Sequence, residues 1–196
     1  IRNVTFLNNL IAFYADTTGK LTSANSISKY MKSQGENISS NLVLLYRSFY
    51  QEAYLLNAVS RYDIHGKRIL ESNEKIYWDD LGLRNLKAEG GIDSYIEKVI
   101  ENAVYKHLCF LGYKVQVGVL GAGEVDFVCT KPGETAYVQA TYLMGEQATR
   151  DREFGPLEKI RDNHPKYVIS VTPFLTSRDE NGIKHISLRE FLNKGL

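Results

Sequence analysis

Polar side chains at strand spacing occur twice in the second half of the sequence. Glu124 and Asp126 lie two residues apart, as do Gln139 and Thr141. Because successive side chains of a strand point to opposite faces, each pair is expected to share a face. Strand pairing that brings Asp126 close to Gln139 would gather carboxylate and amide oxygens, and Glu101 on a preceding helix would add another. Oxygen donors of this kind bind hard cations such as Mg²⁺, so metal-assisted chemistry is the first hypothesis to examine.

A helix and three strands are predicted to position these residues. Apolar residues at helical spacing run over 92–108, and Gly112 is expected to end that helix. Three strands follow, joined by turns that contain glycine. Their predicted ranges are 113–119, 124–130 and 136–143. In the second strand, Val125 and Phe127 are expected on the face opposite Asp126.

The remainder of the second half is predicted to contain two helices with one strand between them. A polar helix includes Phe154, and we expect an interruption at Gly155-Pro156 because proline lacks a backbone donor. An apolar strand follows over 167–171. The final helix is predicted to begin at Ser187, with Glu190 completing a capping box.

The first half has the order of three helices followed by a two-stranded ribbon. The predicted ranges are 4–14, 27–31 and 42–49 for the helices, and 58–62 and 76–78 for the strands. The third helix carries Leu42, Leu45, Tyr46 and Phe49, which are expected to form its apolar face. This is the order of a winged helix-turn-helix. The helical and the strand periodicity of apolar residues both break at 87–91, and we expect the domain boundary there.

Six segments of the sequence are distinctive in their order. They are IYWDDLGLRN at 76–85, ENAV at 101–104, EVDFV at 124–128, YVQAT at 137–141, TRDREF at 149–154 and PKYV at 165–168. In this order they resemble the C-terminal part of a large prokaryotic family of AAA+-type ATPases. In that family a P-loop domain precedes a winged helix and a domain of unknown function with a PD-(D/E)xK nuclease-like core.

The resemblance implies an α+β chain in two parts. A winged helix-turn-helix would occupy 1–88, and a restriction-endonuclease-like α/β domain with a mixed central sheet would occupy 89–196. The ATPase domain of the same full-length chain is then the expected partner. No Gly-x-x-x-x-Gly-Lys-Ser/Thr motif occurs in these 196 residues, and the chain begins at Ile1, so we expect a fragment of a longer protein.

The resemblance also identifies where a nuclease site would lie. PD-(D/E)xK nucleases hold a divalent cation on carboxylates from one helix and two strands, and a lysine beside the last carboxylate helps to position the attacking water. Many members of the ATPase family carry Ile-Glu-Val-Lys at the position of residues 138–141. The catalytic set would therefore be Glu101, Asp126, Gln139 and Thr141, with a carboxylate and a lysine replaced. We expect this set to be inactive and no cofactor to be required. The alternative is Mg²⁺ on Asp126 and Glu101, with a lysine or arginine supplied from elsewhere.

Composition and charge exclude some classes of function. The chain is 43% hydrophobic and 24% charged, as in ordinary soluble proteins, and has no apolar run of ~20 residues, so we expect a cytoplasmic protein with no membrane partner. Residues 1–88 carry 11 Lys and Arg against 8 Asp and Glu, and residues 89–196 carry 13 against 15. Neither part is basic enough for its charge alone to indicate nucleic-acid binding.

A DNA-binding hypothesis rests on five particular cations. Arg47 would lie on the recognition helix, Lys67 and Arg68 on the wing, and Arg150 and Arg152 would contact phosphates from the second region. The alternative is that the winged helix docks against the ATPase domain and that Arg150 and Arg152 lie on a solvated helix face.

Three functions therefore remain open. The first is a non-catalytic DNA-binding or regulatory module with a degenerate nuclease site. The second is a metal-dependent nuclease, which a divalent metal bound at Asp126 would favour. The third is a platform for protein interaction or oligomerisation, which a large apolar self-contact would favour.

Overall fold

Helices and strands are both found along the whole of the chain that the structure describes. The computed structural model describes residues 3–88, 95–145, 147–172 and 178–196, and these residues form seven α-helices and nine β-strands. The strand order is β1-β3-β2-β4-β5-β6-β7-β9-β8, with both parallel and antiparallel pairs. The expected α+β class with a mixed sheet is therefore confirmed.

The chain divides into two compact units. The first consists of Ile1–Val59 and Ser72–Tyr95, and the second of Ser60–Glu71 and Ile96–Leu196. Residues 60–71, the outer part of the ribbon, thus group with the second unit, although the sequence analysis assigned them to the first region. Residues 89–91 of the expected boundary lie outside the described residues, so the division at 88 stays a prediction.

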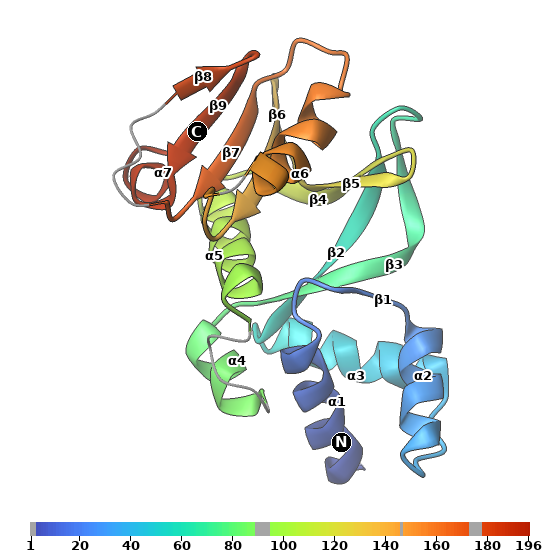
Figure 1. The fold of residues 1–196 in the computed structure, drawn as a ribbon. Coiled ribbons are helices and arrows are strands. Elements are labelled where there is room, and N and C mark those ends of the chain that lie inside the picture. The colour runs from blue at the N-terminus through green and yellow to red at the C-terminus, as the bar shows by residue number, and fades with distance from the viewer. Residues whose placement is uncertain (1–2, 89–94, 146, 173–177) are drawn as a thin grey trace. The chain divides into compact units, whose positions relative to one another are not determined.

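The first unit contains the three predicted helices and the inner part of the ribbon (Figure 1). Its helices and its short strand are α1 (Val4–Asp16), β1 (Leu21–Thr22), α2 (Ala24–Ser33), α3 (Ser40–Glu52) and α4 (Leu81–Lys87). The ribbon strands β2 (Leu56–Asp63) and β3 (Arg68–Trp78) are shared, with residues 56–59 and 72–78 in this unit. Serine hydroxyls cap α2 and α3: Ser23 accepts from the backbone of Ser26, and Ser39 from that of Leu42. Strand β1, which the sequence analysis did not predict, pairs antiparallel with β3.

The buried face of α3 differs from the expected one. Tyr46 is buried as predicted, but Leu45 is 49% exposed, and Val43 and Tyr50 are buried instead. These three buried residues repeat at helical spacing, and Tyr46 packs against Phe6 with 4.9 Å between ring centroids. The outer face of α3 consequently presents leucine side chains to solvent.

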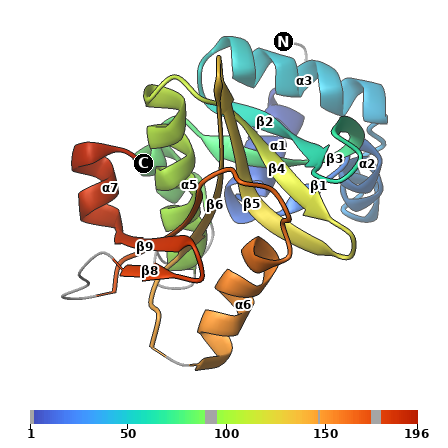
Figure 2. The same cartoon turned by 90° about the horizontal axis from the view of Figure 1, so that it is seen from above.

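The second unit is a sheet with helices on both faces. Its elements are α5 (Ile96–Phe110), β4 (Lys114–Leu120), β5 (Gly123–Lys131), β6 (Glu134–Thr141), α6 (Gln147–Glu158), β7 (Lys166–Ser170), β8 (Arg178–Glu180), β9 (Ile183–Ser187) and α7 (Leu188–Lys194). Strands β4, β5 and β6 pair antiparallel, whereas β6, β7 and β9 are parallel. Figure 2 shows α5 and α7 on one face of this sheet and α6 on the other. The predicted helices and strands are confirmed, except that β8 and β9 were not expected and Ile92 lies outside the described residues.

The outer part of the ribbon is built into the sheet of the second unit. Residues 61–63 of β2 pair in parallel with residues 117–119 of β4. Beyond them, the backbone of Ile64 donates to the carbonyl of Val119 at 3.0 Å. The Ile64 side chain is buried in a core cluster that includes Leu120 and Val125. This part of the ribbon therefore contributes to the fold of the second unit.

An irregularity in β5 lies next to Asp126. On either side of it, Gln116 pairs with Val128 and Gly118 pairs with Val125. An advance of three residues along β5 therefore matches an advance of two residues along β4, so β5 contains one extra residue. A bulge of this kind breaks the alternation of side chains. Val125 belongs to a core cluster with Phe154 of α6, whereas Phe127 contacts Tyr105 of α5. The prediction that Val125 and Phe127 share a face is therefore wrong.

Helix α6 continues through the residues at which an interruption was expected. It runs unbroken over Gln147–Glu158 with Pro156 inside it. The missing backbone donor removes one helical hydrogen bond, but Phe154 and Leu157 are buried against the sheet on either side of the proline. This packing holds α6 across the sheet near β6.

Candidate functional site

A cavity of about 380 Å³ lies where β5 and β6 cease to pair. Helices α5 and α6 and strands β5 and β6 all contribute residues to it. The four predicted catalytic positions, Glu101, Asp126, Gln139 and Thr141, all line this cavity. The described residues that line it are Glu97, Lys98, Glu101, Glu124, Asp126, Gln139, Ala140, Thr141, Arg152, Glu153 and Pro156. Five of them carry carboxylates, and we call this space the acidic cavity.

The side-chain amide of Gln139 is engaged at both ends. Its Oε1 accepts a hydrogen bond from the backbone of Asp126 at 2.6 Å, and its Nε2 donates to Oε2 of Glu153 at 3.1 Å. The Asp126 carboxylate in turn accepts from the backbone of Ala140 at 3.0 Å. These side-chain bonds continue the link between β5 and β6 beyond the last paired residues. The predicted proximity of Asp126 and Gln139 is confirmed.

Glu101 is buried beside a lysine that the sequence analysis did not single out. Glu101 is 3% exposed, and Nζ of Lys98 donates to its Oε2 at 2.6 Å. The two residues lie three apart on α5, a spacing that places them on one helix face. The charge of Glu101 is thus compensated inside the chain, as a buried carboxylate requires.

Glu153 is a second contributor that the sequence analysis missed. It is 5% exposed, and Nε and Nη2 of Arg152 lie 2.9 and 2.8 Å from its Oε1. Burial raises the pKa of Glu153, and the positive charge of Arg152 opposes that rise. The alternating charges at 150–153 had suggested a solvated face, which fits Arg152 with its 58% exposed side chain but not Glu153.

Thr141 occupies the position where the resemblance would place a lysine. It is 1% exposed, and its Oγ1 has no hydrogen-bond partner among the described residues. A hydroxyl supplies no positive charge. Within the described part of the chain, no group of three His, Cys, Asp or Glu side chains is arranged to hold a metal ion.

Besides Arg152, which pairs with Glu153, two of the predicted DNA-contacting arginines are held by carboxylates. Arg47 forms an ion pair with Glu74 within the first unit, and its side chain is 19% exposed. Arg150 forms an ion pair with Glu180 and lies over the ring of Phe154. Neither guanidinium is presented freely to solvent.

The two cations on the ribbon are more accessible. Lys67 is exposed in a turn with φ of +49°, and the side chain of Arg68 is 73% exposed. Arg68 makes one long ion-pair contact of 3.7 Å with Asp63. Of the five predicted nucleic-acid contacts, Lys67 and Arg68 are therefore the best placed to meet a phosphate.

No family model and no solved structure matches the sequence. The chain is 32% identical over 170 residues to an uncharacterized protein of Haemophilus influenzae. The matched region is 87% of this chain but 42% of the relative, so the chain spans about two fifths of that protein's length. Among the described helices, none has the length and apolar character needed to span a membrane.

Proposed function

We propose that this chain is a non-catalytic regulatory module from the C-terminal part of an ATPase, with a degenerate nuclease site. The observation that carries the proposal is the engagement of Gln139 by Asp126 and Glu153. A nuclease would need a charged oxygen donor at this position, because Mg²⁺ sheds water reluctantly and prefers charged oxygen ligands. The neutral amide here links β5 to α6 and so has a structural role.

The order of elements supports the two fold assignments within this proposal. In the first unit, α1, β1, α2 and α3 precede a ribbon whose second strand pairs with β1, as in a winged helix. In the second unit, a helix, three antiparallel strands, a helix and a parallel strand follow one another, as in PD-(D/E)xK nucleases. This order of elements supports the proposal without reference to the site residues.

The surface of α3 favours a protein partner over DNA. The exposed residues of this helix include Asn41, Leu44, Leu45 and Gln51, and no cation is among them. A helix that reads the major groove uses cations and hydrogen-bond donors. The adjacent exposed leucines Leu44 and Leu45 instead fit an apolar surface that packs against protein. We therefore propose the ATPase domain of the same full-length chain as the first partner.

The test of the non-catalytic assignment is a cleavage assay. Purified chain is incubated with plasmid and single-stranded DNA in Mg²⁺ and in Mn²⁺, and no cleavage is expected. Asp126→Asn keeps an acceptor for the Ala140 backbone while removing the charge, and Asp151→Asn is the matched change at an exposed carboxylate of α6. Cleavage that disappears in Asp126→Asn and persists in Asp151→Asn would overturn the proposal.

That outcome would support the second candidate, a metal-dependent nuclease. The specific observation in its favour is that Lys98 and Glu153 bring to the acidic cavity a cation and a carboxylate that β6 lacks. Lys98→Gln and Glu153→Gln would then each be expected to abolish cleavage. Retained cleavage in both variants would mean that neither residue replaces the lost β6 residues.

DNA binding without cleavage is tested by its dependence on salt. If the ribbon contacts phosphates, the double change Lys67→Gln, Arg68→Gln should lower the slope of log affinity against log salt by about two. Arg47→Gln should have little effect, because its guanidinium is held by Glu74. We expect weak binding by the unmodified chain and no change in slope, which would leave a protein as the partner.

A further inference from the structure

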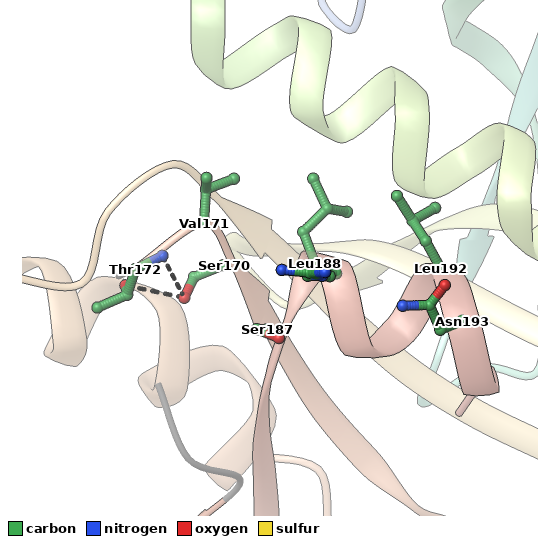
Figure 3. Close-up of a pocket in the computed structure, with 8 residues that line it drawn as sticks. Ser170, Val171, Thr172, Ser187, Leu188, Leu192 and Asn193 are labelled. Atoms are coloured by element: carbon green, nitrogen blue, oxygen red, sulfur yellow. Dashed lines mark hydrogen bonds between the residues drawn. The ribbon is translucent and has the colours of Figure 1, made fainter. Parts of the chain in front are cut away.

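A second cavity, of about 760 Å³, lies beyond the carboxyl ends of the parallel strands β7 and β9 (Figure 3). The register places Ser170 beside Ser187, the last residue of each strand, and α7 begins directly afterwards. In sheets with parallel strands, ligands commonly bind beyond these carboxyl ends. The volume is in the range of small-molecule sites. We call this cavity the Arg189 pocket.

One positive charge dominates the lining of the Arg189 pocket. Arg189 is the sole charged side chain among the described residues that line it. Its guanidinium is exposed and forms no ion pair within the part of the chain that the structure describes. The nearest acidic residue in sequence, Glu190, pairs with Lys194 instead. Asn193 lies one helical turn after Arg189 and lines the same pocket.

Hydroxyl groups form the floor of the pocket. Oγ of Ser170 lies 2.9 Å from Oγ1 of Thr172 and 2.9 Å from Nε2 of His185. Thr172 also accepts from the backbone of Met144 at 3.0 Å. These bonds fix the strand end and the residues just after it, so the polar floor has a defined geometry.

The remaining wall is apolar. Val171, Leu188 and Leu192 line the pocket, and Figure 3 shows their side chains projecting in the same direction. Val171 is 37% exposed and Leu192 is 43% exposed. An apolar wall beside a single guanidinium suits a ligand that has an apolar body and an anionic head.

We propose that the Arg189 pocket binds a small organic anion. Its carboxylate or phosphate head would accept hydrogen bonds from Arg189 and Asn193, because the guanidinium fork matches the planar edge of either group. Its apolar body would cover Val171, Leu188 and Leu192. The site is separate from the acidic cavity, whose carboxylates would repel an anion, and it does not rest on the proposed regulatory function.

The experiment is a calorimetric titration of the full chain with phenyl phosphate, benzoate, benzyl alcohol and inorganic phosphate. At least one aromatic anion is expected to bind, at least about tenfold more tightly than the neutral alcohol, because charge-assisted hydrogen bonds carry that difference. The stronger of the two anions identifies the head group. Inorganic phosphate should bind more weakly than phenyl phosphate, because it has no apolar body.

Two matched substitutions on α7 locate the binding. Arg189→Gln should lower the affinity for the aromatic anion by about tenfold or more. Lys194→Gln removes one charge outside the pocket and should leave the affinity for the anion unchanged. Both positions are exposed, and circular dichroism would establish that the variants remain folded. Absence of binding by either aromatic anion at millimolar concentration would overturn the proposal, as would equal losses in the two variants.

Discussion

The acidic cavity and the Arg189 pocket lie at the same end of one sheet and use charge in opposite ways. The register aligns Thr141 of β6 with Ser170 of β7, and Ser170 with Ser187 of β9. In the acidic cavity the buried carboxylates are held by Lys98 and Arg152. In the Arg189 pocket the guanidinium has no such partner among the described residues. Residue types that are typical of catalysis therefore do not by themselves make a catalytic site when neighbouring groups already pair with them.

The largest expected effect is a loss of stability when the side-chain amide of Gln139, which lines the acidic cavity, is removed. Gln139→Leu should lower the free energy of unfolding by about 2–4 kcal/mol, because the backbone of Asp126 and the carboxylate of Glu153 each lose a partner. Urea denaturation measures this change. Gln147→Leu, at an exposed glutamine of α6, is the control and should change stability by less than about 0.5 kcal/mol. Equal effects at both positions would show that Gln139 does not hold the cavity together.

A smaller loss of stability is expected from replacing the arginine of the acidic cavity, Arg152, and a still smaller one from replacing Arg189. Arg152→Gln should cost about 1 kcal/mol, because Glu153 is buried and loses its charged partner. The side chain of Arg152 is 58% exposed, and solvent screening keeps this cost modest. Arg189→Gln should cost less than about 0.5 kcal/mol, since no described carboxylate depends on it. Urea denaturation measures both losses. A larger loss for Arg189→Gln than for Arg152→Gln would contradict the proposed difference between an arginine that is paired with a carboxylate and one that is not.

The smallest effect is a change in the pH dependence of stability. Burial raises the pKa of Glu153 above its ordinary value of 4.5, so the folded chain holds this proton more tightly than the unfolded chain. The free energy of unfolding should therefore fall as the pH rises from below 4.5 through the folded pKa. Glu153→Gln keeps an acceptor for Gln139 and should remove that part of the fall. Urea denaturation over this pH range measures the profile, and a fall that is unchanged in Glu153→Gln would contradict the prediction.

The strand pairing of the acidic cavity could be predicted from the sequence, but its helical contributors could not. The turn at Gly133, with φ of +76°, joins β5 and β6 in the register that brings Asp126 to Gln139. The bulge beside Asp126 has no sequence signal, because Val125 and Phe127 are both apolar and fit either face. Glu153 stands among alternating charges, and its burial follows from the packing of α6 on the sheet.

The hairpin of β8 and β9, which was not predicted, does have a signal in the sequence. Asn181-Gly182 is typical of a tight hairpin turn, and these residues have φ of +53° and +75° between β8 and β9. In α3, the burial of Val43 and Tyr50 and the exposure of Leu45 depend on where the aromatic rings of α1 lie. Periodicity predicts that such a helix exists, but a shift of one residue in its buried face is decided by tertiary packing.

The central claim is that the acidic cavity does not capture a divalent cation while Gln139 occupies it. Titration of the chain with Mn²⁺, followed by electron paramagnetic resonance, tests this directly. The account predicts no saturable Mn²⁺ site in the unmodified chain and the appearance of one in Gln139→Glu, which adds a charged oxygen beside Asp126. A saturable site in the unmodified chain that disappears in Asp126→Asn would contradict the account.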